Sequence, residues 1–355
     1  MDESTKIIGL MSGTSLDGLD IAYCEFYTLP GGRLDFRLLA AETIPYSQEW
    51  VDTLSHLEQA SAYDYALANV RLGHYFGQQV NAFRSRHDGR VDLVASHGHT
   101  IFHQPQLGLT SQIGDGDAIA AETGLPVAFN FRTFDVALGG QGAPLVPVGD
   151  QLLFSQYEAC LNLGGFSNIS FAHADGRRVA FDISPCNMAL NTLARREGLA
   201  FDRDGLLARR GKVLDGLLRS LDALPYYSLP SPKSLGKEWF VAEFLPLLTV
   251  TESVPDLLAT TTMHIARQIA SVLNANSIRS MVVTGGGALN KYLIELLGGL
   301  APDCRITVPS ADIINYKEAI IFALLGYLRV NNQPNALASV TGARRDSSSG
   351  NLSGM

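Results

Sequence analysis

Apolar runs alternate with glycine-rich turns along the first third of the chain, and this pattern predicts β-strands followed by helices. An apolar run over 6–11 is followed by a turn of small residues, a second run over 19–26, a Pro-Gly-Gly turn and a third run over 34–43. Short apolar runs bounded by turn residues are typical of successive strands. Helical spacing then predicts helices from about residue 48 and over 61–87. A strand over 91–95, a short helix over 118–122 and a strand over 126–131 are expected to follow.

A similar order begins again about 150 residues further along the chain. A strand over 160–163, the turn at Gly164 and Gly165, a strand over 169–173 and a third strand ending near 183 repeat the opening. The expected later elements are helices from 187, from 206 and over 256–273, a strand over 280–284 and a helix after 287.

This repetition predicts an α/β protein of two related domains, with each glycine turn facing a cleft between them. We place the domains at 1–155 and 156–340. Residues 341–355 are rich in Ser, Arg and Gly, and we expect them to form a flexible tail.

Composition narrows the class of protein. A chain of 355 residues with 46% apolar and 17% charged residues can fold into two globular domains. The net charge of −8 argues against nucleic acid or an anionic membrane as the main partner, although a small anionic ligand needs only local amides and cations.

The cysteines and the chain start favour a cytoplasmic protein. The four cysteines lie far apart without a CxxC pair, which is typical of reduced thiols. The acidic residues at positions 2 and 3 are unlike the start of a signal peptide, and the longest apolar run, 319–325, is too short to span a bilayer.

The first turn, in the segment MSGTSLDG, is a candidate phosphate-binding site. Its small residues allow backbone amides and hydroxyl groups to approach an anion closely. Two carboxylates, Asp17 and Asp20, are suitable ligands for Mg2+, mostly through water. The alternative is an ordinary hairpin turn. The candidate phosphate-binding residues are Gly13, Thr14, Ser15, Leu16, Asp17, Gly18 and Asp20.

Two further turns offer related chemistry. The segment LNLGGFSN contributes Gly164, Gly165 and Asn168 in the second half of the chain. The segment VTGGGALN places three glycines between a strand and a helix, which suits a nucleotide at a helix N-terminus but lacks the ending of a P-loop. A tight strand-to-helix connection is the alternative. The three glycines are Gly285, Gly286 and Gly287.

The histidines at 97, 99 and 103 are candidate metal ligands. The first two would lie on one face of a strand, but no acidic or cysteine partner stands nearby in the sequence. We therefore interpret them as structural or sugar-contacting side chains.

The motifs, their order and their spacing resemble the anhydro-N-acetylmuramic acid kinases, a family of the sugar kinase, actin and heat-shock chaperone superfamily. MSGTSLDG and GGQGAPLVP are together the most specific of these motifs. The resemblance covers nearly the whole chain and also runs through SHGHT at 96, GDGDAIA at 114, LNLGGFSN, FDISPCN at 181, FDRDG at 201, SPKSLGKEWF at 231 and VTGGGALN. It implies two ribonuclease-H-like domains of the actin-like ATPase fold, ATP with Mg2+ bound at the glycine turns, and a homodimer.

The resemblance also implies roles for single residues. Asp182, in FDISPCN, would be the catalytic base, and Arg132 and Glu318 would contact the sugar, with His97 as a further sugar-binding candidate. A planar guanidinium suits two-point binding of the lactyl carboxylate of a muramic sugar. The alternatives are a helix cap for Asp182, an ion pair with Asp135 for Arg132, and the polar start of a buried helix for Glu318.

The implied reaction is hydrolytic opening of 1,6-anhydro-N-acetylmuramic acid with ATP-dependent phosphorylation of O6, a step of peptidoglycan recycling. Ser184 and Cys186 replace glycines of the family pattern FD-x-GPGN, and His99 replaces the glutamine of SHGQT. Because we expect these positions near the sugar, another anhydrosugar such as levoglucosan is the alternative substrate. A non-catalytic nucleotide-gated module is a further alternative, which sugar-dependent ATP turnover would exclude.

Overall fold

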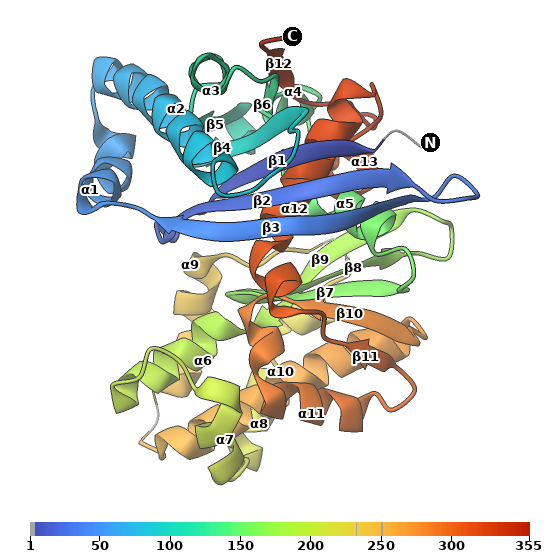
Figure 1. Ribbon diagram of the computed structural model, residues 1–355. Helices are drawn as coiled ribbons and strands as arrows, with labels where there is room; N and C mark the ends of the chain where they lie inside the picture. Colours follow the sequence, from blue (N-terminus) through green and yellow to red (C-terminus); the bar gives the residue numbers. More distant parts are fainter. Residues whose placement is uncertain (1–3, 232, 250) are drawn as a thin grey trace. The chain divides into compact units, whose positions relative to one another are not determined.

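The structure is a computed structural model that describes residues 4–231, 233–249 and 251–355 (Figure 1). The chain forms two compact units. Unit 1 comprises Met1–Leu153 together with Tyr316–Met355, and unit 2 comprises Phe154–Asn315. Within the described residues, no helix combines the length and the apolar character that crossing a bilayer requires.

Unit 1 is built on one sheet in the order β12-β6-β4-β1-β2-β3, with β5 paired to β4. The first three strands pair antiparallel in chain order, while β4 is parallel to β1 and β6 is parallel to β4 (Figure 1). The strands are β1 (Thr5–Ser12), β2 (Gly18–Thr28), β3 (Leu34–Pro45), β4 (Leu93–Gln104), β5 (Leu109–Ile113), β6 (Val127–Phe129) and β12 (Asn351–Ser353).

Two glycines let one helix of unit 1 pack closely on the sheet. A Cβ at Gly9 of β1 would lie 2.0 Å from the carbonyl oxygen of Ala319, and a Cβ at Gly326 would lie 2.6 Å from the Cβ of Ala95 in β4. The helix concerned, α12, is therefore held directly against the central strands. The helices of unit 1 are α1 (Gln48–His56), α2 (Ala62–Arg84), α3 (Gly116–Thr123), α4 (Thr133–Ala137), α5 (Val146–Leu153), most of α12 (Ala311–Val330) and α13 (Ala338–Thr341).

Unit 2 repeats the strand order of unit 1 in the sheet β11-β10-β7-β8-β9. Again three strands pair antiparallel in chain order, and two later strands are added parallel to the first. This shared topology confirms the predicted α/β class with two related domains. The strands are β7 (Ala159–Leu163), β8 (Phe166–Ala172), β9 (Arg178–Pro185), β10 (Ser280–Thr284) and β11 (Arg305–Thr307).

A layer of helices packs against the unit 2 sheet, and the hydrophobic core of unit 2 consists of residues from both (Figure 1). The helix α10 is the centre of this layer, because it contacts α6, α7, α8 and α11 as well as β9. The helices are α6 (Asn187–Ala194), α7 (Leu206–Arg210), α8 (Asp215–Asp222), α9 (Lys237–Trp239), α10 (Val254–Ala275) and α11 (Lys291–Leu300).

The C-terminal residues differ from the expected flexible tail. Residues 351–353 form β12, which pairs antiparallel with β6, and Ser347 and Ser349 are buried. The amide of Ser349 donates a 2.6 Å hydrogen bond to the side chain of Asn335. The prediction of a tail over 341–355 was wrong because an open edge of the unit 1 sheet accepts this segment as a strand.

Candidate functional site

The first glycine turn connects β1 to β2 at the surface of unit 1. It is closed by a 3.3 Å bond from the amide of Leu16 to the carbonyl of Gly13, and Leu16 has a left-handed backbone with φ of 61°. Three of its predicted phosphate ligands have exposed side chains: Thr14, Ser15 and Asp17. Gly18 has a packing role, because a Cβ there would lie 2.3 Å from the carbonyl oxygen of Ile44 in β3.

Asp20 lies on β2 just beyond this turn and is partly buried. Its carboxylate accepts a 2.6 Å hydrogen bond from the hydroxyl of Thr43. Burial raises the pKa of Asp20, and the negative charge of Asp17 raises it further. The two carboxylates therefore form a locally negative pair, which suits a hard cation held partly through water. The described residues contain no cluster of three or more acidic, histidine or cysteine ligands.

Arg132 and His97 meet in unit 1. The guanidinium donates from Nε to Nε2 of His97 at 2.9 Å and from Nη1 to the carbonyl of Gly142 at 2.7 Å. Because Nε2 accepts, the ring of His97 is neutral and its Nδ1 donates to the carbonyl of Gly98 at 2.9 Å. Burial lowers the pKa of His97 well below its ordinary value, and Arg132 lowers it further. A histidine that cannot take a second proton is a stable acceptor for the arginine.

The outer edge of Arg132 remains available for a ligand. No bond to Nη2 occurs within the described part of the chain, so Nη1 and Nη2 can together bind one carboxylate. Burial lowers the pKa of Arg132 to about 10, and the negative charge of Glu318 opposes that shift. The guanidinium is therefore cationic at neutral pH and fixed in orientation by His97 and Gly142.

Glu318 lies in the third turn of α12, so the expectation that it heads the helix was wrong. Desolvation by the surrounding protein raises the pKa of its carboxyl although the side chain keeps contact with solvent, and Arg132 opposes this shift. Asp20 raises the pKa of Glu318 further. Unit 1 thus brings together His97, Arg132, Glu318 and Asp20, which are scattered through the sequence.

Asp135 organises the loop beside Arg132 and is not its ion-pair partner. The carboxylate is fully buried and accepts hydrogen bonds at 2.8 Å from the amide of Gly142 and from the hydroxyl of Thr341. Sequence reasoning considered Asp135 only as a surface partner of Arg132. Asp135 stands a few residues before the GGQG segment, and this closeness in the sequence is the signal that could have indicated a structural role in that loop.

His99 is part of the interior of unit 1. Its Nδ1 lies 2.8 Å from the hydroxyl oxygen of Ser12, which lies 2.6 Å from the hydroxyl of Tyr46. Burial lowers the pKa of His99 to about 4, so the ring is neutral. The histidine that departs from the family pattern therefore supports the end of β1, where the first glycine turn begins.

The second glycine turn connects β7 to β8 in unit 2. The amide of Gly164 bonds to the carbonyl of Phe166 at 3.1 Å, so that amide is used inside the turn. The carbonyl groups of Gly164 and Gly165 accept the amides of Asn187 and Cys186 at 3.0 and 2.8 Å, which ties the start of α6 to the turn. Asn168 lies opposite Asp182 in the pairing of β8 with β9.

Asp182 is a half-buried carboxylate on β9. Its Oδ2 accepts a 2.9 Å hydrogen bond from the amide of Leu235, and among the described residues no bond reaches Oδ1. Burial raises the pKa of Asp182, and the bond from Leu235 opposes that shift. A desolvated carboxylate with one free oxygen is suited to accept a proton. It does not cap α6, whose N-cap residue is Cys186 without a side-chain bond.

Ser184 and Cys186, which replace two glycines of the family pattern, both lie in the interior of unit 2. Both are fully buried. The hydroxyl of Ser184 lies 2.9 Å from that of Ser167 in β8, and Cys186 belongs to the apolar core of unit 2. Burial raises the pKa of the Cys186 thiol to about 12. The side chains at both positions therefore pack in the interior of unit 2.

The third glycine turn packs against the end of β7. Gly285 has φ of 79°, and a Cβ there would lie 2.8 Å from the backbone of Leu163. A Cβ at Gly287 would lie 2.7 Å from the side chain of the same leucine. Glycine is therefore required for the connection itself, and Gly286 and Gly287 also line a pocket.

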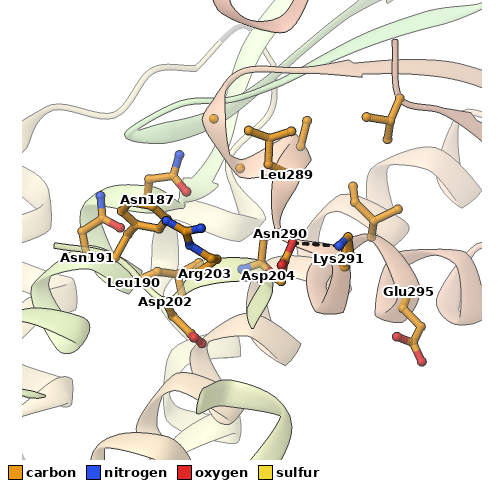
Figure 2. Close-up of a pocket in the computed structure, with 16 residues that line it drawn as sticks. Asn187, Leu190, Asn191, Asp202, Arg203, Asp204, Leu289, Asn290, Lys291 and Glu295 are labelled. Carbon is orange, nitrogen blue, oxygen red and sulfur yellow. Dashed lines mark ion pairs between the residues drawn. The ribbon is translucent and has the colours of Figure 1, made fainter. Parts of the chain in front are cut away.

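That pocket, of about 920 Å³, lies within unit 2 (Figure 2). In the figure, Asn187 and Asn191 extend from α6 on one side and Lys291 and Glu295 from α11 on the other, and Lys291 pairs with Asp204 at 3.3 Å. The lining also includes Leu190, Phe201, Asp202, Arg203, Gly286, Gly287, Ala288, Leu289, Asn290, Ile294 and Val308.

Its size and mixed lining suit a nucleoside-sized ligand, with apolar walls for a flat ring and polar groups at the edge. Sequence reasoning found only the glycines of this pocket. The FDRDG segment at 201 was noticed as a motif, and its residues Phe201 to Asp204 form part of the wall.

Two α/β units of matching strand order, each with a turn of small residues between its first two strands, define the actin-like ATPase class of fold. The family model for anhydro-N-acetylmuramic acid kinase matches residues 5–354. The chain belongs to this family.

Individual relatives match the sequence of this chain over nearly their full length. The anhydro-N-acetylmuramic acid kinase of Streptomyces coelicolor is 38% identical over 369 residues, covering 98% of this chain and 93% of that protein. The one of Gloeobacter violaceus is 36% identical over 375 residues, covering 97% of each chain. The one of Mannheimia succiniciproducens is 34% identical over 371 residues, also covering 97% of each.

Proposed function

We propose that the protein uses ATP to open 1,6-anhydro-N-acetylmuramic acid hydrolytically and to phosphorylate O6, forming N-acetylmuramic acid 6-phosphate and ADP. Family membership supports the reaction class. The observation that carries the choice of sugar is Arg132, whose guanidinium is held by His97 and Gly142 while its outer edge is free. This edge matches the lactyl carboxylate of a muramic sugar.

Levoglucosan has no carboxylate for Arg132 to bind. The residues that suggested this alternative were Ser184, Cys186 and His99, and all three are buried in the interior of their units. Their side chains therefore supply no reason to expect a different sugar. Glu318, with its raised pKa, is the proposed second sugar contact, because a partly desolvated carboxyl is a strong partner for a sugar hydroxyl.

Asp182 is the proposed general base. Its free oxygen takes a proton from water, and the water oxygen forms a bond to the anomeric carbon of the sugar. The bond from that carbon to O6 breaks, and O6 keeps the electron pair. O6 then attacks the γ-phosphorus of ATP, and the bond between this phosphorus and the β,γ-bridging oxygen breaks to release ADP. A positioned base of this kind contributes about 10²- to 10⁴-fold in rate.

In unit 2 the proposed nucleotide-binding residues line the pocket and its glycine turns, and in unit 1 the proposed phosphate-binding residues are those of the first glycine turn. The pocket has room for the nucleoside, and the exposed turn at Thr14 and Ser15 offers hydroxyls to phosphate oxygens. Asp17 and Asp20 would hold Mg2+, which neutralises charge on the transferred phosphoryl group when bound. Gly164 and Gly165 contribute mainly by fixing the start of α6 beside the pocket, and Asn168 is the proposed polar phosphate contact of this turn.

We also propose a cytoplasmic homodimer that acts in peptidoglycan recycling. The family resemblance supports the assembly and the pathway, and the buried thiols of Cys24, Cys186 and Cys304 fit a reducing compartment. Light scattering coupled to gel filtration tests the dimer.

The test of the reaction combines purified protein, ATP and Mg2+ with 1,6-anhydro-N-acetylmuramic acid or with levoglucosan, and follows ADP and the phosphosugar. We expect N-acetylmuramic acid 6-phosphate from the first sugar, and Asp182→Asn should lose about 10²- to 10⁴-fold in rate while still binding ATP. Turnover only with levoglucosan would replace the proposed substrate. No sugar-dependent ADP would reject the kinase and leave a nucleotide-binding module.

A further inference from the structure

Asp182 makes hydrogen bonds through its backbone and its side chain to Tyr226, Lys233 and Leu235 of unit 2. Its backbone amide donates to the carbonyl of Lys233 at 3.1 Å, while its carboxylate accepts from the amide of Leu235. From the other side, the hydroxyl of Tyr226 donates a 2.6 Å hydrogen bond to the backbone carbonyl of Asp182. Backbone and side chain of the proposed base are thus both oriented, by Tyr226, Lys233 and Leu235.

Lys233 links the backbone near Asp182 to the pair Tyr226 and Tyr227. Its ammonium group donates to the carbonyls of Tyr226 and Tyr227 at 3.1 and 3.3 Å and lies 4.6 Å from the centre of the Tyr226 ring. The ring of Trp239 also packs on Tyr226, with ring centres 5.4 Å apart. Tyr226 is 5% exposed, so its hydroxyl is held in place by packing as well as by its bond to Asp182.

A chain of hydrogen-bonded side chains, with the buried His264 at its centre, anchors the next residue, Tyr227. The hydroxyl of Tyr227 lies 2.7 Å from Nε2 of His264, and Nδ1 of the same ring lies 2.6 Å from the carboxylate of Asp222. The carboxylate of Asp222 can only accept a hydrogen bond, so Nδ1 of His264 carries the proton and donates to it. In the neutral ring Nε2 then accepts, and the hydroxyl of Tyr227 donates to it. His264 is fully buried on α10, and Asp222 is further bonded by Arg267 and Gln268.

We infer that Tyr226 and Tyr227 are positioning residues for Asp182, and that the chain Asp222–His264–Tyr227 anchors them to α10. This inference rests on the proposed function, in which Asp182 is the general base. The mechanism itself makes no use of these residues. The arrangement gives a reason for a hydrogen-bonded histidine and aspartate in the helical layer, away from the glycine turns.

A general base acts only when its carboxylate is placed precisely. Asp182 has to hold a water against the anomeric carbon, and a displacement of about 1 Å in such a site can cost on the order of 10²-fold in rate. Without the Tyr226 hydroxyl, the carbonyl of Asp182 loses one fixed partner at the end of β9. Without the Tyr227 hydroxyl, the segment that carries Tyr226 loses its bond to α10.

The experiment compares Tyr226→Phe and Tyr227→Phe with wild type, measuring kcat, KM for both substrates, ATP affinity and melting temperature. Tyr157→Phe is the matched control, because it removes the same hydroxyl from a half-buried residue of unit 2 whose hydroxyl makes no hydrogen bond within the described residues. We expect kcat to fall about 10-fold in Tyr226→Phe and about 3-fold in Tyr227→Phe, with ATP affinity unchanged. Tyr157→Phe should match wild type.

A second comparison separates positioning from general loss of structure. In the Asp182→Asn background, Tyr226→Phe should leave the residual rate unchanged, because no base remains to be positioned. A wild-type kcat in Tyr226→Phe, or an equal fall of rate in both backgrounds, would overturn this inference alone. Absence of sugar-dependent turnover in the wild-type protein would overturn the proposed function and this inference together.

Discussion

Arg132→Lys tests how the protein chooses its sugar. The substitution keeps a positive charge but removes the planar fork, so a carboxylate can no longer bind two nitrogens at once. It also removes the 2.9 Å bond from Nε to His97, which leaves the buried Nε2 of that ring without its donor. The two losses have different consequences for sugars with and without the lactyl group.

The magnitudes follow from the two contacts. Replacing a two-point contact to a carboxylate by a single ammonium contact is expected to cost about 2–3 kcal/mol, or roughly 30- to 160-fold in kcat/KM. The bond to His97 contributes about 1 kcal/mol, or roughly fivefold, whichever sugar is present. The preference for the lactyl sugar should therefore fall roughly 30- to 160-fold, while the rate on a sugar without that group falls about fivefold.

The assay measures kcat/KM for 1,6-anhydro-N-acetylmuramic acid and for 1,6-anhydro-N-acetylglucosamine, which lacks only the lactyl ether. Arg84→Lys is a matched control, since Arg84 is a partly buried arginine of unit 1 that bonds to the carbonyl of Thr123 at 3.2 Å. We expect no change of preference in the control. An equal fall for both sugars in Arg132→Lys would refute the assignment of Arg132 to the carboxylate.

Three further predictions follow from burial and close packing. Because burial raises the pKa of Asp182 and the base must be deprotonated, the acid limb of kcat against pH should have its midpoint above the ordinary aspartate value of 3.8, and a midpoint at or below it would contradict the assignment. Gly285→Ala should cost about 1–3 kcal/mol in unfolding free energy and raise the KM for ATP, since its Cβ would lie 2.8 Å from the Leu163 backbone. Gly216→Ala, with no atom within 4 Å in helix α8, is the control and should stabilise by roughly 0.5–1 kcal/mol in chemical denaturation. Cys186→Gly should lower stability by about 1–3 kcal/mol and leave the ratio of rates on the two sugars unchanged, whereas a tenfold change of ratio, roughly 1.4 kcal/mol, would place the thiol at the sugar.

Local patterns were sufficient for the repeated strand order. The runs over 6–11, 19–26 and 34–43 become β1, β2 and β3 to within a few residues at most ends, because alternating burial and glycine turns act between neighbours in the chain. β5 was not predicted. Its segment, 109–113, has polar residues at three of its five positions and is a strand because it pairs with β4.

Residue types and motifs also pointed to residues that the structure brings together. Arg132 and His97 were both predicted to contact the sugar, and the structure brings them to hydrogen-bonding distance. The pocket wall could not be predicted in this way, because Leu190, Phe201 and Ile294 are ordinary apolar residues until folding places them around one cavity. The same is true of His264, whose two hydrogen-bond partners, Asp222 and Tyr227, come from other segments of the chain.

The sequence by itself determined the α/β class, the duplicated strand order, the glycine turns and the residue types able to bind phosphate, sugar and proton. These depend on local spacing and on chemistry that each side chain carries with it. Only the tertiary structure decided that Ser184, Cys186 and His99 face the interior, that residues 351–353 complete the unit 1 sheet, and that Tyr226 holds Asp182. The physical reason is that burial and hydrogen-bond partnership depend on which distant segments pack together, and no pattern within one segment contains that information.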